Sequence, residues 1–294
     1  MRHGGDPAHR RVVQAALERI RDRLLDAAGL QAGMTLVDVG TGDGLVAFGA
    51  IARIGPSLRV VLTDLSAPLL RHAEGLARGL GVERQCTFLQ GSAERLAGIE
   101  DGSVDVVALR AVLAYVADKP AALRECHRVL RPGGRVALAE PIFRDQALEA
   151  IAMTRAAGTA APPEGGPDFL GLLQRWKAAQ FPSTEEALRA SPLASFSERD
   201  LVRLAGEAGL TDLHLELHLD VRRSPVSSWE VFTATSPHPW APPLREILAT
   251  RFSPAERTLF EQVMRPLVEV GQLLEHEAIA YLTARKPGQP APRA

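Results

Sequence analysis

The sequence holds only two cysteines, and it has no long hydrophobic run. Cys86 and Cys126 form no Cys-x-x-Cys pair, which argues against a disulfide scaffold or a cysteine metal site and is typical of a reducing cytosol. No apolar stretch approaches the roughly 18 residues that a membrane-spanning helix needs. The polar first residues lack the apolar centre of a signal peptide. We therefore expect a cytoplasmic protein with no membrane partner.

Lysine is also scarce, and arginine supplies nearly all of the positive charge. Basic and acidic side chains nevertheless balance, at 34 and 35. Proteins that bind nucleic acid usually carry a basic excess or a basic stripe, so this balance argues against a nucleic-acid partner. Apolar residues make up 46% of the 294 residues, which is enough for a full globular core.

Short apolar runs alternate with helical stretches over the first half of the chain. Strands are expected at residues 35–40, 59–66, 86–92, 104–112 and 135–141. Amphipathic helices are expected at residues 7–28, 44–55, 67–81 and 119–134, the last with a glycine stop. Strict alternation of this kind predicts parallel strands joined by crossover helices, with helices on both faces of the sheet.

After Pro141 the pattern changes. The later stretches are the flexible-looking AAGTAAPPEGGP, helices at 169–181 and 197–209, a period-two strand at 211–221, a helix opened by the capping box at 253–256, a last strand at 276–287 and a disordered tail. We expect a Rossmann-like α/β fold whose doubly wound sheet is mostly parallel with an antiparallel last strand, plus helical cap insertions. The expected parts are an N-terminal helix (1–29), a core (30–141), a helical cap or lid (142–196), and the end of the core sheet (197–294) with a helical insertion (224–272).

The glycine-rich turn LVDVGTGDGLVA follows the first expected strand. Gly42, Gly44 and Ala47 match the dinucleotide pattern G-x-G-x-x-G/A, so binding of NAD is one interpretation. Asp38 precedes the turn, and a carboxylate there repels a pyrophosphate but attracts a cationic ligand. S-adenosylmethionine has a sulfonium and an α-ammonium and no phosphate. Asp64, at the end of the second strand, suits the ribose hydroxyls of either ligand.

Four motifs occur in the order and at the spacing of a known family. They are Asp-x-Gly-x-Gly-x-Gly from Asp38, Thr-Asp-Leu-Ser from Thr63, Gly-Ser-Ala-Glu-Arg-Leu from Gly91 and Arg-Val-Leu-Arg-Pro-Gly-Gly from Arg128. Together they resemble the class I S-adenosylmethionine-dependent methyltransferases, particularly the small-molecule branch that includes ubiquinone and menaquinone biosynthesis enzymes. The resemblance covers residues 30–141 strongly and residues 197–287 loosely, and it implies S-adenosylmethionine as the cofactor.

The resemblance also implies cofactor-binding residues. The methionine part of the cofactor would be held by Asp38, Gly40, Thr41, Gly42 and Gly44. The rest would be held by Asp64 at both ribose hydroxyls, Leu65 against the adenine ring, Ser92 and Ala93 at the adenine edge, and the backbone carbonyl of Arg110 at the ammonium. The family often has aspartate where Ser92 stands, so the adenine contact is expected to be weaker or to come from a neighbour.

Methyl transfer is an in-line displacement, so alignment supplies most of the catalysis and a general base helps only with acceptors that hold their proton tightly. Two residues are candidates for contacting the acceptor: Tyr115, after the fourth strand, and Glu140, at the end of the fifth. The alternatives are a packing role for Tyr115 and a helix cap or surface charge for Glu140.

His214, Glu216 and His218 share one face of an expected strand and raise the question of a metal site. Residues four apart on a strand are separated by roughly 13 Å, which is too far for the two histidines to share one ion. The sequence therefore predicts no metal.

Aromatic side chains concentrate outside the first five strands. They are Trp176, Trp229, Trp240, Phe169, Phe181, Phe196, Phe232, Phe252 and Phe260. These rings suit either a dry pocket for an apolar substrate or the core of the cap or a dimer interface. An apolar face on the long helix from residue 254 to 274 suggests a homodimer.

The sequence thus predicts a methyltransferase that acts on oxygen, nitrogen or carbon of a small, fairly apolar acceptor molecule, with natural-product biosynthesis as a setting. Two alternatives stay open, because a fold alone does not fix function. One is a cofactor-binding relative without methyl transfer, such as a partner subunit or a rearrangement enzyme. The other is an NAD-dependent oxidoreductase on the same fold.

Overall fold

The computed structural model describes residues 6–159 and 168–288, and the chain divides into two compact units. The sheet unit consists of Leu17–Ile142, Phe196–His218 and Ala278–Ala294. The helical unit consists of Met1–Ala16, Phe143–Ser195 and Leu219–Glu277. None of the described helices is long and apolar enough to cross a membrane.

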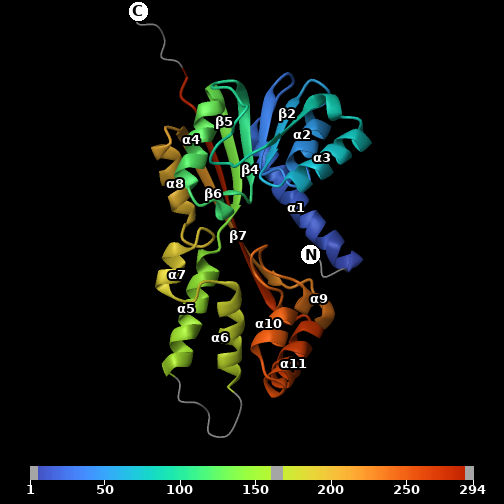
Figure 1. The fold of residues 1–294 in the computed structure, drawn as a ribbon, viewed down its shortest axis with the longest axis vertical. Coiled ribbons are helices and arrows are strands. Elements are labelled where there is room, and N and C mark those ends of the chain that lie inside the picture. Colours follow the sequence, from blue (N-terminus) through green and yellow to red (C-terminus); the bar gives the residue numbers. More distant parts are fainter. Residues whose placement is uncertain (1–5, 160–167, 289–294) are drawn as a thin grey trace, which may run out of the picture. The chain divides into compact units, whose positions relative to one another are not determined.

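Among the described residues, seven strands form one sheet in the order β3-β2-β1-β4-β5-β7-β6 (Figure 1). Their bounds are β1 Thr35–Val39, β2 Arg59–Asp64, β3 Cys86–Gln90, β4 Val104–Arg110, β5 Leu130–Pro141, β6 Thr211–Arg223 and β7 Leu274–Arg285. Strands β1 to β5 pair in parallel, and β7 runs antiparallel to β5 with Tyr281 opposite Ala139. The prediction of a Rossmann-like sheet with an antiparallel last strand is confirmed.

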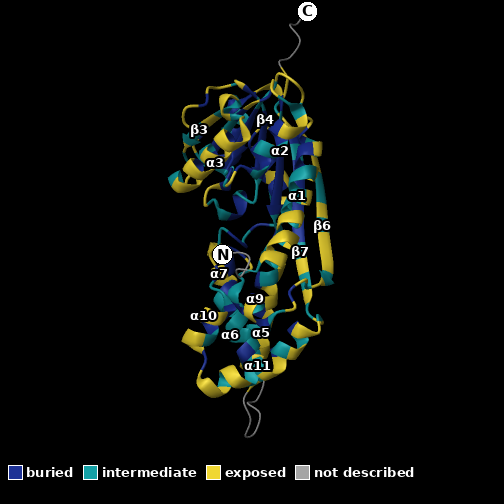
Figure 2. Cartoon of the chain, turned by 90° about the vertical axis from the view of Figure 1, so that its right-hand side faces the viewer, coloured by how far each residue is buried: buried dark blue, intermediate teal, exposed yellow. Residues whose placement is uncertain are grey.

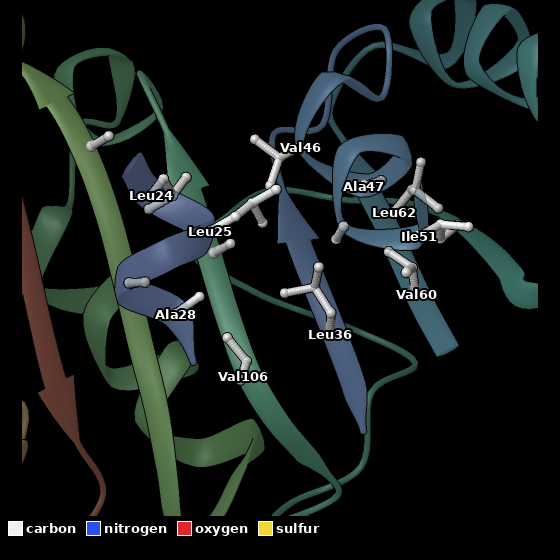
Figure 3. Packing of buried hydrophobic residues seen from close by; sticks show 14 of the residues in the cluster. Leu24, Leu25, Ala28, Leu36, Val46, Ala47, Ile51, Val60, Leu62 and Val106 are labelled. Carbon is white, nitrogen blue, oxygen red and sulfur yellow. The ribbon is translucent and has the colours of Figure 1, made fainter. Parts of the chain in front are cut away.

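Helices cover both faces of the sheet (Figure 1). They are α1 Pro7–Ala28, α2 Leu45–Ile54, α3 Ala67–Leu80, α4 Lys119–Val129 and α8 Glu198–Glu207. The second half of α1 packs with α2 and α3 over one face, where Leu24, Ala47 and Ala73 join Leu36 and Val60 in a buried cluster (Figure 3). On the other face α4 contacts β5 and α8. Successive residues of a strand face opposite sides of the sheet. Because helices cover both faces, the central strands have apolar side chains on both sides.

The α4–β5 junction differs from the prediction of a helix that runs to a glycine stop. The helix ends at Val129, and Leu130 is already extended, with φ −65° and ψ 135°. Leu130 is fully buried and lies opposite Val104 of β4. Proline at position 132 also disfavours helix at Arg131. The segment Arg-Pro-Gly-Gly therefore belongs to β5, and the prediction of a helix there is wrong.

The helical unit has its own core. Its helices are α5 Arg144–Thr159, α6 Phe169–Gln180, α7 Glu185–Ala190, α9 Trp229–Ala234, α10 Leu244–Arg251 and α11 Pro254–Glu269. Trp229, Phe252 and Phe260 are buried in one cluster, with Trp176 packed edge-on against Phe260 at 5.7 Å between ring centroids. Most of the cap aromatics therefore form the core of this unit, while Trp240 is 56% exposed.

Several local expectations for the second half of the chain can be compared with the structure. The predicted capping box at Ser253 is confirmed, and the structure shows a second one at Ser197, but α11 ends at Glu269, short of residue 274. The flexible-looking stretch begins as the end of helix α5, and its residues 160–167 lie outside the described residues. The expected disordered tail falls largely on residues 289–294, which also lie outside them.

Candidate functional site

The glycine loop lies at the carboxyl end of β1 and leads into α2. Gly40 and Gly44 have left-handed backbone conformations, with φ 64° and 81°, that side chains other than glycine rarely adopt. Each is also crowded: a Cβ atom on Gly40 would lie 2.6 Å from Val112 Cγ2, and one on Gly44 would lie 2.2 Å from Phe48 Cε2. The backbone N–H of Thr41 donates to the carbonyl of Thr63 at 2.9 Å, which joins the loop to β2.

Asp38 lies beneath this loop and is 1% exposed. Its Oδ2 accepts hydrogen bonds from the Thr41 hydroxyl at 2.6 Å and from the backbone N–H of Ala47 at 3.1 Å. Burial raises the pKa of Asp38 to about 6, although these two bonds and the charge of Arg110 oppose the rise. The carboxylate therefore braces the glycine loop against the first turn of α2.

Asp64 ends β2 and contacts the glycine loop from the neighbouring strand. Its Oδ2 accepts the backbone N–H of Gly42 at 2.9 Å, and its Oδ1 accepts the backbone N–H of Ser66 at 2.8 Å. The next residue, Leu65, is 72% exposed. The end of β2 thus presents an oriented carboxylate beside an exposed apolar side chain.

The backbone donors of the glycine loop distinguish the two nucleotide interpretations. A pyrophosphate needs free N–H groups at the start of the helix. Here the N–H of Gly42 and that of Ala47 donate to the carboxylates of Asp64 and Asp38, and that of Gly44 donates to the carbonyl of Thr41 at 2.9 Å. Two carboxylates at such a loop favour a ligand that has a positive charge and a diol over one that has phosphates.

The turn after β3 holds Ser92 and Ala93. The Ser92 hydroxyl contacts the Glu94 carboxylate at 3.2 Å, and Glu94 in turn accepts the backbone N–H of Asp118 at 2.8 Å. Glu94 lies in the Gly-Ser-Ala-Glu-Arg-Leu motif but is not among the site residues predicted from the sequence. It places a carboxylate beside Ser92.

The loop after β4 approaches the glycine loop. Arg110 is the last residue of β4, and Ala111 follows it with a φ of 54°. Val112 then packs over Gly40, as the crowding around that glycine shows. A positive φ at alanine is strained, and such strain persists only where surrounding contacts impose it. Alanine itself gives no sequence signal for this geometry.

Glu140, at the end of β5, supplies part of that constraint. It has no exposed surface, and its two oxygens accept the backbone N–H groups of Val112 at 3.0 Å and Ala114 at 3.2 Å. Burial raises the pKa of Glu140 to about 6. The carboxylate thereby binds two backbone N–H groups at the start of the short 3-10 turn η2, Leu113–Tyr115. Tyr115 ends this turn, and an acceptor contact by either residue stays a prediction.

A buried lysine that the sequence analysis missed lies close by. Lys119 is 6% exposed, and its Nζ donates to the carbonyl of Val116 at 2.9 Å and lies 4.7 Å from the ring centroid of Phe196. Burial lowers the pKa of Lys119 to about 8, while the negative charge of Glu140 opposes this change. The two charges partly offset the cost of burying each other.

The histidines of β6 lie on either side of Glu216. His214 Nε2 is 3.3 Å from Glu216 Oε1, and His218 Nε2 is 3.2 Å from Oε2. Arg23 of α1 also pairs with Glu216. Much of strand β6 is exposed (Figure 2). No group of three or more His, Cys, Asp or Glu side chains that could hold a metal ion occurs in residues 6–159 and 168–288.

Comparisons with known proteins agree with this geometry. A family model described as a methyltransferase domain matches residues 37–138. The nocamycin O-methyltransferase of Saccharothrix syringae is 33% identical over 204 residues, which cover 67% of each chain. The ubiquinone/menaquinone biosynthesis C-methyltransferase UbiE of Hahella chejuensis is 39% identical over 118 residues, which are 40% of this chain and 46% of that protein. The chain thus spans less than half the length of that relative.

The fold has close counterparts as well. The crystal structure of YcgJ from Bacillus subtilis matches with a TM-score of 0.57 at 18% identity, covering 92% of this chain and 98% of that one. The glycine loop, its two carboxylates and these matches define a Rossmann-like methyltransferase. The chain belongs to the class I S-adenosylmethionine-dependent methyltransferases, as the sequence motifs predicted.

Proposed function

We propose that the protein transfers a methyl group from S-adenosylmethionine to oxygen, nitrogen or carbon of a small, fairly apolar molecule. The observation that carries this proposal is that Asp64 and Asp38 hold the N–H groups of Gly42 and Ala47 in the glycine loop. Such a loop suits a cationic cofactor with a ribose and disfavours a pyrophosphate. When bound, S-adenosylmethionine supplies an electrophilic methyl group on its sulfonium.

The residues around the loop fit the parts of this cofactor. Asp64 is already oriented by two N–H donors, and it would hold the ribose hydroxyls with its remaining lone pairs. Exposed Leu65 would pack against adenine, while Ser92, Ala93 and Glu94 would face the adenine edge. The glycine loop from Gly40 to Gly44, with Thr41, would lie along the methionine part.

Positive charge on the ligand would be met by Asp38 and by the backbone carbonyl of Arg110. A cation near Asp38 favours the ionised form of a carboxylate whose pKa burial has raised. Tyr115 would contact the acceptor, because it ends the turn that follows β4. An acceptor that loses its proton readily needs no general base, because alignment of the acceptor with the methyl group supplies most of the catalysis.

The partner is proposed to be a small molecule. The name of the nocamycin O-methyltransferase supports a natural product as the acceptor and oxygen as the methylated atom. The near balance of 34 basic and 35 acidic side chains is unlike that of most nucleic-acid binders. A homodimer is also proposed, because apolar side chains are exposed along and after α11. Val263 of α11 is 36% exposed, and Val270, the first residue after the helix, is 62% exposed. Sedimentation equilibrium tests this association.

Calorimetric titration of S-adenosylhomocysteine and NAD into the wild type and two Asp64 variants tests the cofactor assignment. Asp64→Ala removes the ribose contact and the loop contact together, and we expect affinity for S-adenosylhomocysteine to fall by about 2–3 kcal/mol, or 30- to 150-fold. Asp64→Asn keeps one oxygen acceptor, so the loss should be smaller. Binding of NAD without S-adenosylhomocysteine would contradict the proposal.

Transfer of labelled methyl tests the reaction itself. Labelled S-adenosylmethionine is incubated with a panel of phenols, enols and amines, and product is detected by mass. Methylation of any member supports the proposal. Tight cofactor binding with no labelled product across the panel would favour the alternative of a cofactor-binding relative that does not transfer methyl.

A further inference from the structure

We propose that Glu140 is a positioning residue for the cofactor: it holds the loop after β4 against Gly40, so that the glycine loop keeps the shape that S-adenosylmethionine binds. This inference rests on the proposed function, because it concerns the same cofactor site. It assigns Glu140 a role through backbone geometry instead of a direct contact with the acceptor.

The side-chain hydrogen bonds of Glu140 join β5 to the loop after β4. Its Oε1 accepts the N–H of Val112 at 3.0 Å and its Oε2 accepts the N–H of Ala114 at 3.2 Å, while the N–H of Ala111 donates to the carbonyl of Ala139 at 2.8 Å. Residues 139 and 140 of β5 therefore fix the loop at three points, residues 111, 112 and 114. Hydrogen bonds to a charged, buried acceptor are among the stronger ones in proteins.

The same loop segment touches the cofactor loop. The space beside Gly40 is filled by Val112, whose Cγ2 would be 2.6 Å and Cγ1 3.3 Å from an added Cβ atom. Gly40 has a φ of 64°, and the next residue, Thr41, bonds to buried Asp38. A shift of Val112 would therefore release the backbone of Gly40.

The conformation of the loop needs an anchor. Ala111 lies at φ 54°, in the left-handed region that is unfavourable for a residue with a Cβ atom. The chain would relax if the three N–H contacts were lost. The Glu140 carboxylate is also shielded from solvent, because it has no exposed surface. Lys119, whose pKa the negative charge of Glu140 raises against the effect of burial, is 6% exposed.

This arrangement argues against Glu140 as a general base. Both of its oxygens are engaged by backbone donors, and an acceptor proton would have to reach a carboxylate that solvent does not reach. A base must come within hydrogen-bond reach of the proton that it removes. The geometry assigns the residue to the support of the loop.

Glu140→Gln tests the inference in the full chain, with Asp105→Asn as a matched control. A glutamine offers one oxygen, and its NH₂ group would face an N–H donor, so one of the two bonds is lost. Asp105 of β4 accepts the backbone N–H of Thr35 of β1 at 2.7 Å, at the amino ends of these two strands and away from the glycine loop. We expect Glu140→Gln to bind S-adenosylhomocysteine about ten- to thirtyfold more weakly, with the control within about twofold of wild type.

Hydrogen exchange at single amides identifies the cause. The amide that loses its bond, that of Val112 or that of Ala114, should exchange faster in Glu140→Gln than in wild type, and both amides should exchange at the wild-type rate in Asp105→Asn. Full affinity for S-adenosylhomocysteine despite faster exchange would overturn the inference, as would an equal loss of affinity in the control. Val112→Ala leaves the carboxylate intact, removes the contact with Gly40 and serves if Glu140→Gln does not fold. We expect severalfold weaker binding from it, and wild-type affinity would overturn the inference.

The two proposals fail in different ways. If the wild-type protein binds no S-adenosylhomocysteine, the proposed function is wrong and the inference falls with it. If wild type binds and both Glu140→Gln and Val112→Ala bind equally well, only the inference is wrong.

Discussion

The carboxylate of Asp38 accepts the Thr41 hydroxyl at 2.6 Å while the aspartate side chain is almost completely buried. Both hydrogen bonds of Asp38 reach Oδ2, from Thr41 and from the N–H of Ala47. They do not offset the loss of water around the charge, and the pKa of Asp38 rises to about 6. In the cofactor-free protein this residue therefore costs stability when it is ionised, which is a common compromise at binding sites.

The first expected outcome concerns stability against pH. Because the folded-state pKa of Asp38 is raised from 3.8 to about 6, folding favours the protonated form. Its contribution is fully present below pH 3.8 and is lost as pH rises to about 6. Over that range the free energy of unfolding of wild type should fall by about 3 kcal/mol relative to Asp38→Asn. Urea unfolding of both proteins at several pH values measures this difference, and a constant difference would contradict it.

Cofactor affinity should have the opposite pH dependence. In the proposed site, ionised Asp38 would attract the ammonium of S-adenosylhomocysteine, and protonation below pH about 6 would remove the attraction. Affinity should therefore fall about tenfold between about pH 7 and pH 5 in wild type. In Asp38→Asn it should be weaker at pH 7 and lack this Asp38-dependent fall. Calorimetry across this range provides the measurement, and parallel curves for the two proteins would place the ammonium away from Asp38.

Gly40→Ala and Val112→Ala should be strongly coupled. An alanine at position 40 combines a strained φ of 64° with a clash at 2.6 Å, so we expect a loss of about 2–5 kcal/mol in the free energy of unfolding. Shortening Val112 removes the clash. The double variant should therefore lose less free energy of unfolding than the sum of the two single losses. Urea unfolding of all four proteins completes the cycle.

Gly42→Ala is the control for this cycle. Gly42 has a φ of 60° but nothing within 4 Å of an added Cβ atom. We expect a cost of about 1–2 kcal/mol from backbone strain alone, with no rescue by Val112→Ala. A rescue of Gly42→Ala would show that the Val112 effect is not a local contact.

The aromatic residues of the helical unit should divide by burial. Phe260 has no exposed surface, and Phe260→Ala should cost about 3–5 kcal/mol of stability. Trp240 is 56% exposed, and Trp240→Ala should change stability by less than about 0.5 kcal/mol. Thermal unfolding compares the two. Equal losses of stability would contradict this prediction, because they would mean that the Trp240 ring packs against another surface.

The sheet unit was largely predictable because its signals are local. Apolar periodicity located α1 and the first strands, and the spacing of Asp38, the glycines and Asp64 located the loop. Each of these signals depends on residues close together in sequence. The order of the strands was not predicted, because it depends on pairing between residues that lie far apart in the sequence.

The remaining features depend on contacts between distant residues. Glu140 acts on Val112, 28 positions away, and no local pattern announces such a bond. Ala111 adopts a positive φ that alanine does not signal, and Lys119 looks like an ordinary surface charge until its burial is known. The helix over residues 119–134 was overextended because the strand pairing of Leu130 with Val104 overrides helix propensity.

Strand β7 joins the sheet between β5 and β6, yet it is the last strand along the chain. When synthesis has reached the end of α11, the edge of β5 that pairs with β7 is therefore still unpaired. Such an edge is a template for wrong pairing with another nascent chain. The helical unit also needs Val268 for its core, so neither unit is complete before α11 and β7 have been synthesised. Protection of this edge by a chaperone during the interval should therefore raise the yield of folded protein.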